Sequence, residues 1–340
     1  MVLAKVLSLL CVVHFSLSSP TATTSPPETE GAKEAKKYAE FVIDGRLVSG
    51  WDANSPEFTE DVDLSNLGIE ILMEDAFAKF QDLNELNLSW NNLTSSKNVA
   101  ASLKRTKPDI LNLSHNNLGS PEEDWPESWD DRSYKQNKTF LLDSKYFWSI
   151  DLSHNNLVGL GIDFDVVHFN LSNNKIKCHN AIENRRFYGA SIFVANLDLS
   201  HNMINCQNKF FLPDLQNLDM SYNKLTAIES GLFEGPALLE NLNLSHNAIR
   251  YIHPYAFRSL MYLRNLDLKF NKIRTIYKRV WAQSLSLNYI DLSSNRLNHL
   301  DWRRTFFFQR RISSPIQVNI ENNTNVKCSY NSSEFIFNQE

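Results

Sequence analysis

The sequence predicts an α/β-type repeat solenoid, in which stacked coils share one long parallel sheet. Two observations support this fold class. One pattern of aliphatic residues and asparagine recurs along most of the chain, and its clearest copies are 24 residues apart. Within each copy, apolar and polar residues alternate as in a half-buried strand. No single copy can bury its own apolar face, so the copies must stack into a continuous core.

The repeated pattern reads Leu-x-x-Leu-x-Leu-x-x-Asn-x-Leu, and residues 239–249 are a clear copy. The paired leucines point inward from the strand. The asparagine at the ninth position carries both amide donors and a carbonyl acceptor, so it can satisfy backbone groups that the turn leaves inside the coil. A degenerate copy at Val62 and a worn one at Asn323 bring the expected number to about eleven coils. The remaining ladder asparagines are Asn91, Asn116, Asn155, Asn174, Asn202, Asn223, Asn247, Asn271 and Asn295. In the regular coils a second apolar anchor is expected on the outer side, at Phe233, Phe257 and Trp281.

The segments before the repeats suggest export and a cap. Residues 1–18 carry one lysine and an apolar run followed by small residues, which is typical of a cleaved signal peptide. Residues 19–40 are polar and rich in proline and threonine, and we expect a disordered linker. Residues 41–60 contain two short apolar runs around Asp44-Gly45, which predict a hairpin that caps the first coil.

The solenoid is expected over residues 61–325, with a C-terminal cap or tail at 326–340. The spacing of ladder asparagines lengthens between Asn116 and Asn155, so an insertion is placed at 119–146. It is acidic and contains Trp125 and Trp129. A solvated loop and a partner-docking loop are both compatible with that composition.

The repeated pattern resembles the extracellular leucine-rich-repeat family in its 24-residue form, over roughly residues 60–325. The resemblance implies a horseshoe with the sheet on the concave side, as in Toll-like receptor ectodomains and many secreted binding proteins. The chain differs from family members that have four-cysteine caps, because residues 19–60 contain no cysteine.

Charge and cysteine usage narrow the partners. A formal charge of −5 and a pI near 6.0 do not suggest nucleic acid. The sequence shows neither a membrane span nor a lipid-anchor signal, so a secreted, extracellular protein is expected. Cys178 and Cys206 each follow a ladder asparagine by four residues, which places them on adjacent coils at disulfide distance. Cys328 then remains, either for a homo- or heterodimer or as a buried thiol.

Catalysis is not expected. Ser-His occurs at Ser114-His115, Ser153-His154, Ser200-His201 and Ser245-His246, always at the same two repeat positions. A role repeated that often is architectural, whereas catalysis needs one distinguished constellation. Nothing completes a metal-ligand set at these sites, so we predict no enzyme activity, no metal and no cofactor.

Two surfaces are candidates for ligand binding. The first is on the concave face, where bulky or charged groups stand among acidic ones; the alternative is ordinary surface variety. Its residues are Asp219, Tyr222, Asp267, Lys269, Phe270 and Tyr289. The second is a basic edge, suited to an anionic glycan or membrane surface or simply solvated. Its residues are Lys224, Arg250, Lys272, Arg274 and Arg296.

Glycosylation would decide which face is free. Sequons occur at Asn87, Asn92, Asn112, Asn137, Asn170, Asn243, Asn322 and Asn331. Four of them, Asn87, Asn112, Asn170 and Asn243, are expected to point from the concave strands, and occupancy there would obstruct that face. Asn137, in the insertion, is the site most expected to be used.

The sequence therefore predicts a secreted protein that recognises a protein or glycan ligand, with immunity or host interaction as the expected setting. The alternative is a matrix or assembly component that forms oligomers, with Cys328 as a possible cross-link. An enzyme is the third and weakest reading.

Overall fold

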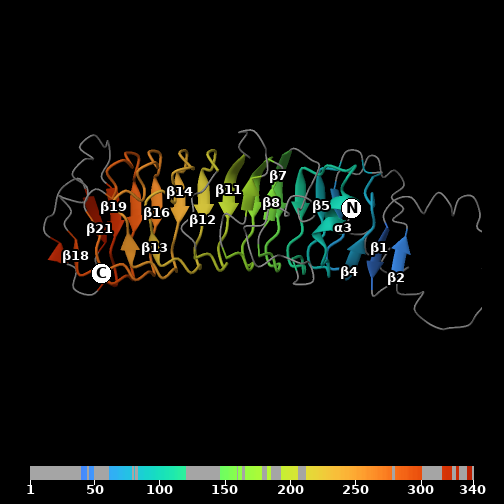
Figure 1. The fold of residues 1–340 in the computed structure, drawn as a ribbon, viewed down its shortest axis with the longest axis horizontal. Helices are drawn as coiled ribbons and strands as arrows, with labels where there is room; N and C mark the ends of the chain where they lie inside the picture. Colours follow the sequence, from blue (N-terminus) through green and yellow to red (C-terminus); the bar gives the residue numbers. More distant parts are fainter. Residues whose placement is uncertain are drawn as a thin grey trace, which may run out of the picture.

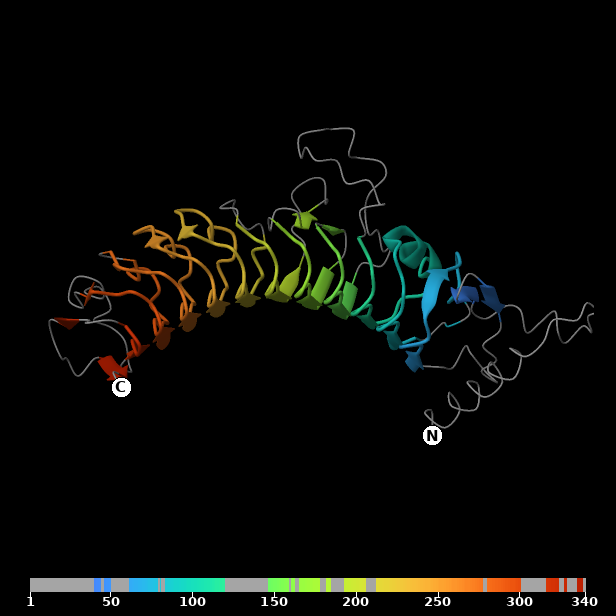
Figure 2. The same cartoon turned by 90° about the horizontal axis from the view of Figure 1, so that it is seen from below.

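The chain forms a curved rod of stacked coils, with one long sheet along its inner side (Figures 1 and 2). These findings come from a computed structural model, in which the neighbouring strands of the long sheet all run parallel. The structure describes residues 40–43, 46–49, 61–78, 80, 83–119, 146–158, 160–162, 165–177, 182–184, 193–205, 212–277, 280–300, 316–323, 327–328 and 335–338.

The long sheet has twelve strands, in the order β21-β19-β17-β16-β14-β12-β11-β9-β7-β6-β5-β3. The spatial order of these strands follows their order along the chain, as expected when each successive coil contributes one strand. The strands are β3 (Asp61–Asp63), β5 (Glu85–Asn87), β6 (Ile110–Asn112), β7 (Tyr146–Asp151), β9 (Asp165–Asn170), β11 (Val194–Asp198), β12 (Asn217–Asp219), β14 (Asn241–Asn243), β16 (Asn265–Asp267), β17 (Tyr289–Asp291), β19 (Ile316–Asn319) and β21 (Phe335–Asn338).

Short elements form the rest of each coil, and the described residues include one helix. Helix α3 (Ser96–Ser102) begins at Ser95, whose hydroxyl accepts a hydrogen bond from the backbone N–H of Asn98 at 3.3 Å. The outer strands pair with one another in small sheets. They are β1 (Glu40–Ile43), β2 (Arg46–Ser49), β4 (Ile69–Leu72), β8 (Leu160–Ile162), β10 (Ile182–Asn184), β13 (Ala227–Ile228), β15 (Tyr251–Ile252), β18 (His299–Leu300) and β20 (Lys327–Cys328).

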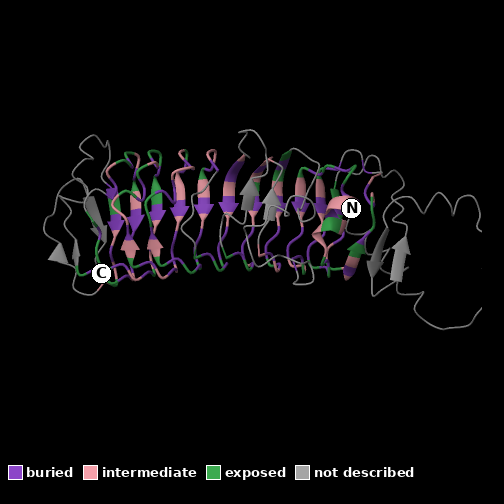
Figure 3. Cartoon of the chain, viewed as in Figure 1, coloured by how far each residue is buried: buried purple, intermediate pink, exposed green. Residues whose placement is uncertain are grey.

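A continuous apolar core runs between the sheet and the outer side, and Figure 3 shows it as buried segments repeated from coil to coil. The inward leucines of the repeat are almost fully buried, Leu242 and Leu244 among them. The expected outer anchors Phe233, Phe257 and Trp281 are also buried and stack on each other, with ring centroids 6.0 and 5.2 Å apart. This part of the sequence prediction is confirmed.

The chain turns out of each strand through a residue in the left-handed region. Its φ lies between +52° and +59° in all eleven coils, although none of these residues is glycine. They occupy the eighth repeat position and are Asn66, Trp90, His115, His154, Asn173, His201, Tyr222, His246, Phe270, Ser294 and Asn322. Such a conformation is uncommon outside glycine and asparagine, so surrounding interactions must hold it.

The ladder asparagine that follows holds the turn from inside. Asn247 is buried, and its Nδ2 donates to the carbonyl oxygens of Met220 at 2.9 Å and Leu244 at 3.2 Å. Its Oδ1 accepts the backbone N–H of Leu225 at 3.0 Å. One side chain thus joins two coils and satisfies backbone groups that water cannot reach.

The sheet extends past the expected end of the solenoid at residue 325. Strand β21 pairs in parallel with β19, and β20 pairs with β18 on the outer side, so the tail 326–340 contributes a twelfth strand. The tail alternates in Phe335-Ile336-Phe337 but does not carry the full repeat pattern, so the sequence predicts eleven coils. At the other end, β1 and β2 form an antiparallel hairpin, and β1 also pairs with β4 of the first coil.

Several predictions fall outside the described residues. They concern the acidic insertion after Gly119, the pair Cys178 and Cys206, and the sequons at Asn137 and Asn331. Cys328 lies in β20. Among the described helices, none has the length and apolar character needed to cross a bilayer.

Replacing Asn247 with alanine should lower the free energy of unfolding by about 1–3 kcal/mol, because buried backbone groups of two coils lose their partner. Denaturant-induced unfolding followed by circular dichroism measures this. The matched control is Asn288→Ala, since Asn288 is exposed, and its effect should stay within about 0.5 kcal/mol. Equal unfolding midpoints for the two variants would show that the buried ninth-position asparagines do not stabilise the coils.

Candidate ligand-binding groove

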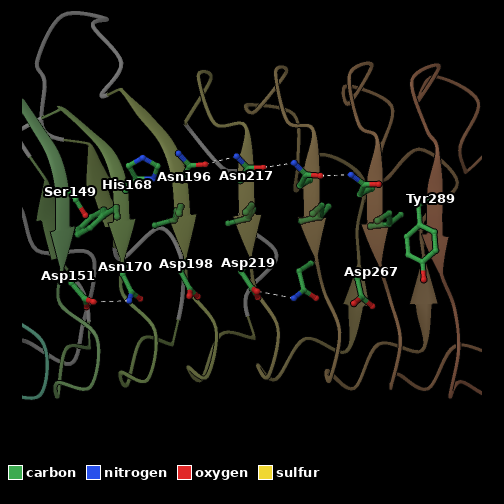
Figure 4. A pocket seen from close by; sticks show the side chains of 18 residues that line it. Ser149, Asp151, His168, Asn170, Asn196, Asp198, Asn217, Asp219, Asp267 and Tyr289 are labelled. Carbon is green, nitrogen blue, oxygen red and sulfur yellow. Dashed lines mark hydrogen bonds between the residues drawn. The ribbon is translucent and has the colours of Figure 1, made fainter.

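A groove of about 690 Å³ runs along the concave face from β7 to β17. Its floor includes the inward-pointing Leu197, Leu218, Leu242 and Leu266, and polar side chains rise on both sides of them (Figure 4). The polar groups come from the third and fifth repeat positions, which flank the inward leucine of each strand. Because alternate strand residues face the same side, these two positions form two rows along the rod.

The third-position row is a ladder of amides. The Nδ2 of Asn265 donates to the Oδ1 of Asn241 at 2.6 Å, and Asn241 donates in the same way to Asn217. Asn217 in turn donates to Asn196, whose own Nδ2 reaches the carbonyl oxygen of Val167 at 3.3 Å. Four identical side chains are therefore fixed in one orientation across four adjacent strands, as Figure 4 shows.

The fifth-position row consists of aspartate and asparagine, and it closes the ends of the strands from β3 to β19. In all eleven coils, the Oδ1 at this position accepts the backbone N–H two residues later, for example from Ser221 to Asp219 at 2.7 Å. Aspartate and asparagine side chains are well suited to close such a turn. The other carboxylate oxygen remains on the groove side, and at Asp219 it accepts from Asn243 at 2.8 Å.

Tyr289 ends the groove on β17. Its hydroxyl donates to the Oδ2 of Asp291 at 3.1 Å, and Figure 4 shows the ring face-on, extending along β17. Burial, followed by the nearby carboxylate of Asp291, raises the pKa of Tyr289 above that of a free phenol. The hydroxyl therefore stays protonated and holds the ring in place.

The residues predicted to bind ligand are divided by the structure. Asp219, Asp267 and Tyr289 line the groove, whereas Tyr222 and Phe270 do not. Placing those two rings on the sheet face was wrong, because they follow the strands by three residues and lie in the left-handed turn.

Lys269 also lies beyond the strand end and forms an ion pair with Asp267 at 3.1 Å. The hydrogen bond to Asp267 and the attraction of that carboxylate raise the pKa of Lys269. The lysine therefore neutralises one groove carboxylate and does not stand as an isolated cation.

The rings at the eighth position form an exposed column beside the sheet. His201, Tyr222, His246 and Phe270 stack in sequence with centroids 4.1 to 4.4 Å apart, and Tyr222 and Phe270 are about half exposed. A second stack joins Trp90, His115 and His154 at 3.8 and 4.0 Å, and Asn173 lies between the two stacks in the repeat order. The ring faces cover each other, so the column presents mainly ring edges outward.

The Ser-His pairs thus belong to the turn. The serines are buried beneath it, and the histidine rings stack in the column, with the same arrangement in each coil. Within the described coils, no three His, Cys, Asp or Glu side chains gather as metal ligands.

The predicted basic residues lie on the chain that leaves the turn, outside the groove lining. They are Lys224, Arg250, Lys272, Arg274 and Arg296, and all except the half-buried Lys272 are exposed.

Two concave sequons lie within the groove. The Nδ2 of Asn170 donates to the Oδ2 of Asp151 at 3.1 Å, and Asn243 does the same to Asp219. Asn87 and Asn112 belong to the same row in earlier coils. Asn92 and Asn322 are exposed away from the strands.

Sequence reasoning missed the amide ladder and the aromatic group at the far end of the groove. There, half-exposed Trp148 packs edge-on against His168 with ring centroids 5.3 Å apart, and His168 lines the groove. A signal for the ladder was present, since aligning the repeats puts asparagine at the third position of four successive coils.

Acid should destabilise the fold through the ring column. Burial is the main cause that lowers the pKa of His115 and His246 from the usual 6.5, and the electrostatic effects of His154 on the first and Lys269 on the second lower it further. The unfolded chain therefore binds more protons in this range, so stability is complete above about pH 6.5 and falls as pH drops below it.

Melting temperatures between about pH 7.5 and 5 test this, with the double variant His115→Asn and His246→Asn. Asparagine tolerates the left-handed turn, so the double variant should fold and lose less of its melting temperature on acidification. The control His253→Asn lies outside the column and should behave as the unmodified protein. The same acid-induced loss in all three proteins would contradict the role of the column.

Known proteins share both the repeat and the fold. Residues 194–249, 213–273 and 238–297 match the family model described as leucine rich repeat. No curated protein sequence matches the chain. The fold resembles Toll of Drosophila, solved in complex with Spatzle, at 20% identity and a TM-score of 0.55, covering 79% of this chain and 38% of that one.

Two further structures are similar. TLR13, solved in complex with ssRNA13, has 17% identity and a TM-score of 0.51, with 74% of this chain and 40% of that chain covered. The functional domain of InlJ from Listeria monocytogenes has 18% identity and a TM-score of 0.53, with 84% and 54% covered. The chain thus spans only about half or less of each of these proteins. The repeat match shows leucine-rich repeats over residues 194–297, and the parallel coil fold of the described residues is similar to that of Toll.

Proposed function

We propose that this protein is a secreted recognition protein that binds an extracellular protein or glycan through its concave groove, in immunity or host interaction. The observation that supports this most is the groove itself, in which two fixed rows of polar side chains from successive strands face outward over the same floor. Such preorganised polar groups lose little freedom when a ligand binds. Toll and TLR13, which share the fold, were both solved with a bound partner.

A binding role also fits the chemistry of the described residues better than catalysis does. The aspartates of the groove occupy the same repeat position in each coil, and each accepts a backbone N–H of the following turn. An active site needs a local departure from such regularity. The first eighteen residues support export, and we propose that the chain acts outside the cell.

Assembly into oligomers is the second candidate. Leu238, Met261, Tyr262 and Leu285 are 43 to 57% exposed at two adjoining repeat positions of neighbouring coils. An exposed apolar row of this kind marks contact surfaces. If assembly is the function, the native protein should elute as a multimer, and Tyr262→Arg should convert it to a monomer.

Blocking the groove should abolish partner capture. In the variant Asn241→Trp, an indole would fill the centre of the groove, and the strand tolerates an aromatic residue. Cross-linking from native extracellular fluid, followed by mass spectrometry, should then lose the species that the unmodified glycosylated protein captures. The control Gln283→Trp places the same ring at an exposed site outside the groove lining and should keep them. Capture of the same species by both variants would show that the groove is not the binding face.

Glycan occupancy gives an independent check. If the groove binds ligand, Asn170 and Asn243 should be unmodified in the secreted protein, because a glycan on either would occupy the groove. Asn92 and Asn322 should be available for modification because they are exposed. Peptide mapping by mass spectrometry measures all four sites, and full occupancy at Asn170 or Asn243 would exclude the groove as the recognition surface.

A further inference from the structure

The hydrogen-bonding groups of the groove restrict the ligand class. None of the residues that line it is lysine or arginine, and its carboxylates are Asp151, Asp198, Asp219 and Asp267. Ionised carboxylates only accept hydrogen bonds, so the ligand must present donors. Sulfated or uronate chains and acidic peptides would be repelled, because the described lining residues include four carboxylates and neither lysine nor arginine.

The third-position amide ladder of the groove can bind ligand groups that both donate and accept hydrogen bonds. Within the ladder, Asn217 and Asn241 each use one N–H and one lone pair for their neighbours. Each keeps a second N–H and a second lone pair for a ligand. A hydroxyl group has the same dual capacity, and a chain with several hydroxyls on each unit would meet the ladder repeatedly.

The spacing of the rows favours a sugar chain over a peptide. Neighbouring strands are about 4.8 Å apart, so both rows repeat at that distance along the rod. An extended peptide advances only about 3.3 Å per residue and shifts out of register with each coil. A pyranose unit in an extended chain advances by about the strand spacing, so successive units meet the same pair of rows. From β7 to β17 there are six such steps, about 29 Å in all.

Aromatic rings lie at one end of the groove and beside the other. Tyr289 lines one end with its hydroxyl held by Asp291, and Trp148, which is outside the lining, contacts the lining residue His168 at the opposite end. The C–H face of a pyranose packs well on an aromatic face, while its equatorial hydroxyls reach neighbouring carboxylates and amides. Combined with the rows between them, these rings provide apolar contact and oriented polar groups within one site.

We propose that the groove binds a neutral, hydroxyl-rich glycan chain that runs along the rod, with pyranose units on successive coils and Tyr289 as the stacking platform at one end. This inference rests on the proposed recognition function of the groove and names its ligand class. A basic peptide is the competing occupant, because it too would donate to the carboxylates.

An array of linear neutral hexaoses tests the proposal, with glucose, mannose and N-acetylglucosamine units in α and β linkage. The full-length glycosylated protein should bind at least one of them and should not bind a heparin hexasaccharide. Calorimetry with that hexaose and its disaccharide should show tighter binding of the longer chain, because it reaches more coils.

Variants assign the contacts. Tyr289→Ala and Asn241→Ala should each weaken hexaose binding by about tenfold, the loss expected for one contact or hydrogen-bond set. Tyr255→Ala is the control, since Tyr255 is an exposed tyrosine outside both the groove and the exposed apolar row, and it should leave binding unchanged. Circular dichroism confirms that each variant is folded.

The outcomes separate the two proposals. Binding of no neutral hexaose, or binding that Tyr289→Ala and Asn241→Ala leave unchanged, overturns the glycan assignment. If an oligolysine peptide binds instead and Asn241→Trp abolishes it, the groove remains a recognition site with a protein ligand. If Asn241→Trp changes no partner at all, the proposed function itself fails.

Discussion

Every coil must turn out of its strand while keeping backbone polar groups away from water, and this requirement organises the whole molecule. Three consecutive devices meet it. An aspartate or asparagine closes the strand end, a left-handed residue reverses the chain, and the ladder asparagine ties the turn to the preceding coil. Since an unpaired buried group is costly, the devices recur with little change from coil to coil. Because these devices recur in each coil, they fix the distance at which surface side chains repeat along the rod.

The recognition surface consists of polar groups that the turns do not use. Asp219 gives one oxygen to its turn and keeps the other on the groove side, while the third position has no structural duty in the turn. Asparagines at the third position therefore form the row of hydrogen-bonded amides that ends at Asn265, which is distinct from the buried ninth-position ladder. The regular backbone converts a local choice of side chain into a row, so the groove has a fixed period and two chemically distinct sides.

The repeat pattern made the coil fold predictable from the sequence, because the spacing of leucine and asparagine indicates eleven coils. Of the long sheet, strand β21 was missed, since Phe335-Ile336-Phe337 lacks the asparagine that marks a coil; the short outer strands from β4 onward and helix α3 were not predicted either. The site was harder. Tyr222 and Phe270 were assigned to the sheet because bulky residues near strands suggest a binding face, but the reversal of the chain carries them into the ring column. Spacing gives the repeat position of a side chain, whereas stacking depends on rotamers across neighbouring coils.

Aromatic residues at left-handed positions have a consequence for how this surface changes over evolution. Trp90, Tyr222 and Phe270 hold a backbone geometry that asparagine would adopt with less strain, and Asn66, Asn173 and Asn322 do so elsewhere in the chain. Replacing one of these aromatic residues with asparagine would therefore leave the apolar core unchanged and remove one ring from the exposed column. The column is a part of the molecule where substitutions can accumulate without unfolding it, so a lineage can remodel its flank while the groove chemistry stays as it is.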